Sequence, residues 1–449
     1  MPIYHPMKSI NSVTVINPET NEILEDFDIH IENGRIISVE PSKSNSKENG
    51  LDGSNLYAIP GLIDTHVHAL SFLYEEVPGL FDLKWVFRQQ RKNLSAYIRG
   101  GITTVRDLGS ALKLLRKISK KASHLKIESP RIFYAGPIFT VPNGYPYFIG
   151  KISSLITMFT GPIKIELTEA KGESYARKMV DKVVAGGASV IKVGYQSVMY
   201  DDDLTEIPLI SLHLLRIIVD QAHKHNLPVA IHCCYRRDLQ NLLDAPDIHF
   251  DSLEHLIIDE ELSKDEIKRF AERNIPISTT LMTYGILDHV ERYESLLEQE
   301  PECFEKKPYN FLLSANEKLR SGRYGEISNY VGEKCLTTGS KYMRANLKNL
   351  YSEGVKIIFG TDSAGAVTPP GRPHWEFIDM TRAGMTSIDV LKSATSGAAD
   401  VLRQPDLGRL KEGAIADIVL LKRNPLENVE NTKEIAYVIR EGKLIYKAD

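Results

Sequence analysis

The chain has 449 residues, of which 42% are hydrophobic and 25% are charged, and these ordinary values exclude a mostly disordered or low-complexity protein. The net charge of −4 gives no basic excess that would indicate nucleic-acid binding, and no apolar run reaches the roughly 18 residues of a membrane span. The N-terminus shows no secretory signal, and Cys233 and Cys234 are adjacent among only four cysteines. We therefore expect free thiols and a cytoplasmic location.

Both ends of the chain have β character. Residues 9–60 alternate between apolar and polar side chains, and Asn33-Gly34 is a strong hairpin turn signal. Near the C-terminus, residues 416–421 are mostly apolar, and Glu441-Gly442 separates two further short strands. This pattern predicts a small β-sandwich domain that is composed of residues 1–60 and 401–449.

Between these ends, short apolar runs alternate with amphipathic helical stretches. Eight runs are candidate strands: 58–63, 103–105, 131–134, 189–193, 229–231, 252–253, 275–278 and 356–359. Eight β/α alternations predict an α/β fold, a (β/α)8 TIM barrel over residues 61–400. Roughly 75 residues separate the last two runs. We expect the charged, mostly helical residues 285–345 to form an insertion over one face.

Polar residues directly follow several of the apolar runs. In a TIM barrel, the C-terminal ends of the strands line the active site, so these residues should share one rim. His66 and His68 are two residues apart, which places both imidazoles on the same side of a strand. Imidazole and carboxylate together suit zinc or another divalent transition metal. The predicted metal ligands are His66, His68, Lys192, His232, His255 and Asp362.

Lys192 is an unusual member of this set. A lysine at the rim can be a solvated cation, or it can form a Schiff base with a carbonyl substrate. A third reading is reaction of the amine with CO2, which gives a carbamate that can bridge two metal ions. Without that modification, a cation among metal ligands is electrostatically unfavourable.

The motifs resemble those of the amidohydrolase superfamily over nearly the whole chain. The matching segments run from Ile59 to His68, from Gly101 to Asp107, over Ile191-Lys192-Val193, from Asp251 to His255 and from Phe359 to Ser363, and they continue at residues 384–386, 394–395 and 408–417. The chain is most similar to the imidazolonepropionase-related branch, which includes metal-dependent carboxypeptidases and prolidases.

The resemblance implies a centre of two divalent metal ions, which we expect to be zinc. His66, His68 and Asp362 would hold the first ion, while His232 and His255 would hold the second. Carboxylated Lys192 and a hydroxide would bridge the two ions. Asp362 would then be catalytic, because it would accept the proton of the hydroxide and pass it to the leaving amine.

The chain departs from this branch where substrate is recognised. Relatives often carry Gly-His-Gly after the third strand, but residues 140–146 contain no histidine. Relatives also place a catalytic tyrosine two residues after the fifth-strand histidine, where this chain has Cys234. A one-residue insertion would give that role to Tyr235, and packing on the rim is the alternative. For the two thiols we favour packing over metal binding.

Five further residues are expected at the substrate, namely Asn143, Tyr145, Tyr195, Arg372 and His374. Gln196 and Tyr200 follow Lys192 and are additional candidates for lining the pocket. Arg372 would meet a substrate carboxylate with two hydrogen bonds, and a solvated loop arginine is the simpler reading.

The sequence predicts a hydrolase that cleaves an amide bond of a small molecule, such as an N-acyl amino acid or a dipeptide-like compound. The alternative is a cyclic amide, carbamate or urea-type C–N bond in a xenobiotic, which the missing Gly-His-Gly favours. A catalytically inactive scaffold is disfavoured because all six candidate ligands are present. We expect a small-molecule substrate and no nucleic-acid or membrane partner, and relatives suggest a homo-oligomer by analogy.

Overall fold

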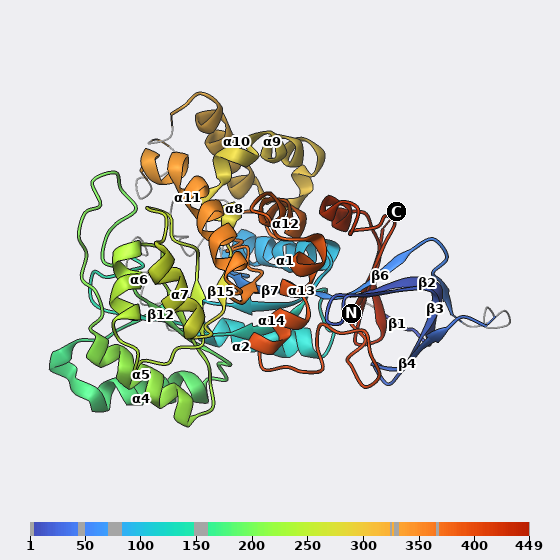
Figure 1. Ribbon diagram of the computed structural model, residues 1–449, viewed down its shortest axis with the longest axis horizontal. Helices are drawn as coiled ribbons and strands as arrows, with labels where there is room; N and C mark the ends of the chain where they lie inside the picture. The colour runs from blue at the N-terminus through green and yellow to red at the C-terminus, as the bar shows by residue number, and fades with distance from the viewer. Residues whose placement is uncertain are drawn as a thin grey trace.

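The computed structural model describes residues 4–43, 50–70, 83–147, 160–323, 326, 332–364 and 368–448. Strands from both ends of the chain form a sheet at one side of the molecule, and helices surround a second group of strands at its centre (Figure 1). No helix among these residues is long and apolar enough to cross a membrane.

The terminal sheet joins the two ends of the chain. Its strands follow the order β1-β19-β18-β17-β6-β2-β3-β4, and β5 pairs with β2. The bounds are β1 His5–Pro6, β2 Ser9–Asn17, β3 Glu22–Glu32, β4 Arg35–Pro41, β5 Leu51–Asp52, β6 Tyr57–Pro60, β17 Ile418–Leu421, β18 Ile435–Arg440 and β19 Lys443–Lys447. The antiparallel pair of β6 and β17 connects the N-terminal strands to the C-terminal ones.

Both predicted hairpins are confirmed. Asn33-Gly34 joins β3 to β4, and Glu441-Gly442 joins β18 to β19. All four turn residues have positive φ, between 51° and 78°. A two-residue turn of this kind matches the twist of the strands that it joins, and Asn and Gly adopt it at low cost.

The central strands are parallel and lie in two groups. One group has the order β7-β8-β9, and the other has the order β11-β10-β12-β13-β14-β15-β16. The bounds are β7 Leu62–Val67, β8 Ile102–Asp107, β9 Arg131–Tyr134, β10 Ile138–Thr140, β11 Lys164–Glu166, β12 Ile191–Gly194, β13 Val229–His232, β14 Ser252–Glu254, β15 Ile277–Ser278 and β16 Ile357–Ile358. Every predicted run overlaps one of these strands, and β10 and β11 are additional.

Backbone hydrogen bonds link the two groups near both β9 and β7, the outer strands of the first group. The amide of Ser189, just before β12, donates to the carbonyl of Tyr134 in β9 at 2.9 Å. Near β7, the amide of Thr65 donates to the carbonyl of Phe359 at 3.1 Å. Val67 and Ser363 form an isolated parallel β-bridge. The strand ends after β7 and β16 are therefore adjacent in space, although almost 300 residues separate Thr65 from Phe359.

Helices separate most of the central strands and cover them. The helices are α1 Leu83–Arg99, α2 Leu112–Ser123, α4 Gly172–Ala185, α5 Leu212–Lys224, α6 Arg236–Leu243, α7 Lys264–Glu272, α8 Leu281–Tyr284, α9 Val290–Gln299, α10 Lys306–Arg320, α11 Glu333–Ser352, α12 Pro373–Arg382, α13 Ser387–Ser393 and α14 Ser396–Val401, with short 3₁₀ turns at η3 Glu169–Lys171, η4 Ile286–His289, η5 Pro301–Cys303 and η7 Val429–Lys433. Ser263 and Glu266 form a reciprocal capping box that fixes the start of α7.

The segment between β15 and β16 has a hydrophobic cluster of its own. Helices α9 and α10 lie at the top of Figure 1, away from the terminal sheet. Leu297 and Leu312 from these helices pack with Met282 of α8 and Trp375 of α12. The helical character predicted for residues 285–345 is confirmed over the part of this segment that the structure describes.

Candidate metal centre

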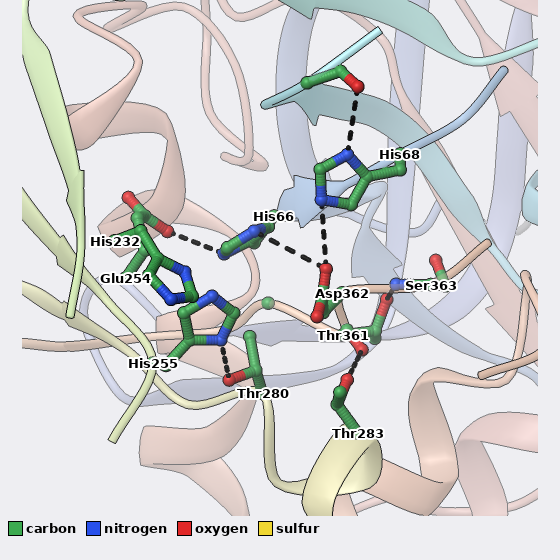
Figure 2. Close-up of polar contacts among 12 residues, drawn as sticks. His66, His68, His232, Glu254, His255, Thr280, Thr283, Thr361, Asp362 and Ser363 are labelled. Atoms are coloured by element: carbon green, nitrogen blue, oxygen red, sulfur yellow. Dashed lines mark hydrogen bonds and ion pairs between the residues drawn. The ribbon is translucent and has the colours of Figure 1, made fainter. Parts of the chain in front are cut away.

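The six predicted ligands lie at or just beyond the C-terminal ends of the central strands. His66 is in β7 and His68 follows it, Lys192 is in β12, and His232 ends β13. His255 follows β14, and Asp362 lies four residues after β16. Parallel strands present their carboxyl ends at one edge, which brings these distant residues together. Figure 2 shows the four histidines and Asp362 turned toward one another.

His66, His68 and Asp362 form one group of possible metal donors. The Asp362 Oδ1 atom lies 3.2 Å from His68 Nε2 and 3.6 Å from His66 Nε2. One donor atom from each residue falls within 4.8 Å of the other two. Burial lowers the pKa of His68, and its hydrogen bond with Asp362 raises it, with a net increase. Two imidazoles and a carboxylate at this separation suit one divalent transition metal.

His232 and His255 belong to a second group, and the third member is Cys234. The two imidazole rings have centroids 4.5 Å apart, and their planes are inclined at 71°. The Nδ1 atom of His255 is 2.9 Å from the Thr280 hydroxyl (Figure 2), which leaves Nε2 for another partner. Sequence reasoning favoured packing for Cys234, whereas the structure places its sulfur among nitrogen donors.

Lys192 is buried near both groups, since its charge acts on the histidines of each. Its side chain is 2% exposed, and its ammonium nitrogen has no hydrogen-bond partner among the described residues. Burial lowers the pKa of Lys192 to about 8. An unpaired buried amine is costly, because the charged form loses its hydration without gaining hydrogen bonds.

Glu254 is a residue of the site that sequence reasoning did not assign. Its Oε2 atom lies 3.0 Å from His66 Nδ1, and Arg106 donates to Oε1 at 2.7 Å. Burial raises the pKa of Glu254, but Arg106, His66 and Lys192 together outweigh this and hold the pKa well below its usual range. The carboxylate therefore fixes His66 with Nε2 directed toward Asp362. The sequence signal that could have identified Glu254 was a glutamate inside a buried strand, next to the candidate ligand His255.

The backbone adopts left-handed conformations at two of the candidate ligands. His255 has φ of 78° and Asp362 has φ of 52°, a region that non-glycine residues rarely occupy. Thr361 is held by Asp64, which accepts from its hydroxyl at 2.6 Å and from its amide at 3.1 Å. This buried pair restrains the turn that presents Asp362.

The residues expected at the substrate lie in different places. The Tyr145 ring stacks on the His232 ring at 3.7 Å, and Asn143 lies two residues before it with an exposed side chain. Tyr195 is buried, and its hydroxyl interacts with Asn241. Arg372 pairs with Glu300 of the segment between β15 and β16, and the His374 ring contacts Trp375.

The hydroxyl of Tyr235 donates to the carbonyl of Met199 at 3.0 Å. Two other tyrosines reach the centre instead. The Tyr200 hydroxyl lies 3.1 Å from His232 Nε2, and it accepts from Tyr284 at 2.8 Å. Gln196 Oε1 is 2.7 Å from the same nitrogen. The sequence singled out Gln196 and Tyr200 through their position after Lys192, but it gave no signal for Tyr284.

Comparisons with known proteins identify related chains. The model of the amidohydrolase family matches residues 57–445. Ochratoxinase of Aspergillus niger is 27% identical over 293 residues, which cover 63% of this chain and 51% of that protein, so the match spans about half the length of the relative. Imidazolonepropionase of Anaeromyxobacter sp. (strain K) is 29% identical over 113 residues, which cover 23% of this chain and 26% of that protein.

A solved structure of a Xaa-Pro dipeptidase with methionine bound in its active site has the same fold. Its TM-score is 0.74, and the alignment covers 98% of this chain and 99% of that chain at 20% identity.

Proposed function

This chain belongs to the amidohydrolase family, and from that premise we propose that it is a metal-dependent hydrolase of small molecules that cleaves a C–N bond of the amide type. One observation carries this proposal: two groups of possible metal donors lie at the carboxyl ends of parallel strands, close enough to the buried amine of Lys192 for its charge to act on all four histidines. Groups that meet in a buried cluster at this edge of an α/β fold are the expected setting for metal-assisted hydrolysis.

The residues present fit two divalent metal ions, for which zinc is our proposal. His66, His68 and Asp362 would hold the first ion, and His232 and His255 the second. The Lys192 nitrogen, which has no hydrogen-bond partner within the described part of the chain, fits carboxylation by CO2, because a carbamate would replace an unpaired cation by an anion that both ions could share. When bound, two such ions lower the pKa of a water molecule and polarise a carbonyl oxygen.

The side chains of this protein then hold and move the protons. Asp362 lies within 3.6 Å of both first-group imidazoles, where its carboxylate can accept a proton and return it to the leaving amine. Glu254 holds His66 in one orientation, and the Asp64–Thr361 pair restrains the Asp362 turn. Tyr145, stacked on His232, would form one wall for the substrate, with Asn143 beside it.

Two substrate classes compete within this proposal. An N-acyl amino acid or dipeptide-like amide is the leading class on the family resemblance. A cyclic amide, carbamate or urea is favoured by one observation, since Arg372, the arginine expected to bind a substrate carboxylate, is paired with Glu300. Under our proposal Tyr235, Tyr195 and His374 contribute only if substrate binding rearranges their present contacts.

We also propose the wider organisation. The hydrogen bonds that link the two groups of central strands near β9 and β7 support closure into a (β/α)8 barrel over residues 61–400, with residues 1–60 and 401–449 as a separate β-sandwich domain. The insertion at 285–345 would help to select substrates. The four cysteines form no disulfide, which supports a reducing cytoplasm, and a homo-oligomer is proposed by analogy.

Metal analysis of the Lys192→Ala variant tests the centre directly. We expect about two divalent ions per wild-type chain, and loss of most of this metal and of the activity in the variant, because the bridging anion is missing. Lys117→Ala, on the exposed face of α2, is the matched control and should behave as wild type. A Lys192→Ala enzyme with full metal and full activity would refute the bridging role.

A hydrolysis screen identifies the substrate class. The zinc-loaded protein is incubated with N-acyl amino acids, dipeptides, lactams, carbamates and ureas, and amine release is measured. Selective turnover of the first two groups supports the leading class, and turnover of the others supports the alternative. A protein that holds no metal and hydrolyses none of them would be a scaffold, contrary to our proposal.

A further inference from the structure

We infer that Cys234 is a third protein ligand of the second metal ion, together with His232 and His255. This inference rests on the proposed function, since it concerns one of the two ions proposed above. It adds a sulfur donor to a centre for which the sequence predicted only nitrogen and oxygen ligands. The three residues come from adjacent strand ends, after β13 and β14.

The distance between the donor atoms supports coordination of a common ion. Cys234 Sγ lies 3.5 Å from His232 Nε2, and one donor atom from each of the three residues is within 4.8 Å of the others. Zinc binds sulfur at about 2.3 Å and imidazole nitrogen at about 2.0–2.1 Å, so two such ligands at a tetrahedral angle are about 3.5–3.6 Å apart. The separation of the sulfur from the His232 nitrogen therefore matches that of two ligands on one zinc ion.

The sulfur lies beside two hydroxyls, and burial raises the pKa of the Cys234 thiol to about 12, so a thiolate forms there only when a metal ion displaces the proton. Cys234 is fully buried, and the hydroxyls of Tyr200 and Tyr284 lie 3.5 and 3.3 Å from Sγ. Tyr284 donates its proton to Tyr200, and the Tyr200 hydroxyl in turn lies beside His232 Nε2, the Cys234 sulfur and the Tyr145 hydroxyl. Once a metal ion takes Nε2, a hydrogen bond from the Tyr200 hydroxyl to the sulfur would stabilise a bound thiolate.

Coordination requires that the Cys234 thiol lose its proton. The S–H bond of Cys234 breaks, one metal–sulfur bond forms, and the proton is released to solvent. A soft thiolate would make this ion harder to remove than one held by imidazoles alone, and would favour zinc or cadmium over manganese.

The neighbouring cysteine provides a matched control. Cys233 is equally buried and belongs to the same turn, but its sulfur points to the backbone carbonyl of Tyr235 at 3.7 Å. It is not a member of either donor group among the described residues. Replacing Cys233 by serine makes the same chemical change one residue away from the proposed ligand.

Cobalt substitution distinguishes the two cysteines without any substrate. The metal-free protein is loaded with Co²⁺, the number of cobalt ions bound per chain is measured, and the near-ultraviolet absorption spectrum is recorded. We expect a sulfur-to-cobalt charge-transfer band in the wild type and in Cys233→Ser, and its loss in Cys234→Ser. Zinc affinity of Cys234→Ser should fall by at least about 100-fold, more than the loss of a residue that merely orients a ligand.

The possible results separate this inference from the proposed function. A wild-type protein that binds two cobalt ions without the band overturns the inference and leaves the proposed function intact. A band that survives in Cys234→Ser also overturns it. A protein that binds no cobalt, zinc or manganese overturns both. Since the wild-type spectrum alone tests for sulfur ligation, the result does not depend on the folding of the variant.

Discussion

Among single residues, Glu254 is a buried carboxylate with two partners, an arginine that neutralises its charge and a histidine that it orients. Arg106 neutralises one of its oxygens, and His66 contacts the other. Ser252 adds a hydrogen bond at 2.6 Å. A buried carboxylate is stable only when it is paired in this way, and here the pairing also orients a candidate metal ligand.

The Glu254→Gln variant should bind metal more weakly. The amide cannot hold His66 with the strength of a carboxylate, so we expect a 10–100-fold loss of affinity for one of the two ions. Titration with a chelating indicator measures this loss. Glu260→Gln, an exposed glutamate that pairs with Arg236, is the control. Equal metal affinity in the two variants would contradict the orienting role.

Between elements, a buried carboxylate connects helix α12 to the start of α8. Glu376 of α12 accepts from the amides of Leu281 and Met282 at 2.7 and 2.8 Å. These amides belong to the first turn of α8, where no backbone carbonyl of the helix can accept their hydrogen bonds. Burial nevertheless raises the pKa of Glu376 from its ordinary value of 4.5 to about 8. This connection positions the chain at Thr280, the partner of His255.

The raised pKa predicts a pH-dependent stability. Between pH 4.5 and about 8 the folded protein keeps a proton on Glu376 that the unfolded chain releases, so the stability falls as pH rises, by up to about 1.4 kcal/mol per pH unit. Glu376→Gln cannot titrate and should remove this component of the slope. Denaturant unfolding at pH 5, 6.5 and 8 measures the difference between wild type and variant.

The control for this experiment is Glu353→Gln, an exposed position just after α11. It should leave the slope of stability against pH unchanged. A Glu376→Gln protein whose pH slope equals that of the wild type would show that the carboxyl is already ionised at neutral pH.

For the whole molecule, a cluster of charges attaches the terminal sheet to the central strands. Arg131, the first residue of β9, donates to Asp417 and to Glu441, both at 2.7 Å. Arg440 is fully buried and donates to the carbonyls of Ala122 and Ser129. These contacts lie at the amino-terminal end of β9, whereas the metal donors lie at the carboxyl ends. The terminal sheet therefore supports the fold without entering the site.

The Arg131→Met variant should be destabilised by about 3–5 kcal/mol, because it leaves Asp417, which is 2% exposed, as an unpaired buried charge. Adding Asp417→Asn should recover part of that loss. Thermal unfolding measures both effects, and metal content at low temperature should be unchanged.

Arg237→Met breaks an exposed ion pair with Glu206 and should cost no more than about 1 kcal/mol. If the two arginine variants lost the same stability, the charge cluster would not be what attaches the terminal sheet.

The sequence by itself determined the two hairpins, the family and most of the central strands, but not β10 and β11. Apolar runs of strand length, turn residues with positive φ and the motifs around His66 and Asp362 are local signals, so they can be read without coordinates. The placement of the six candidate ligands at one edge also followed from sequence, because parallel strands align their carboxyl ends whatever their register. Their role as ligands remains a prediction.

Only the tertiary structure decided which side chains meet across strands and helices. The contact of Glu254 with His66, and of Tyr284 with Cys234, joins segments that are 188 and 50 residues apart. The pairing of Arg372 with Glu300 is equally non-local. Such contacts depend on strand register and helix packing, which are fixed by the whole core and leave no periodic pattern in the chain. For that reason the sequence located the candidate ligands, but the structure revealed the sulfur of Cys234 and the carboxylate of Glu254 beside them.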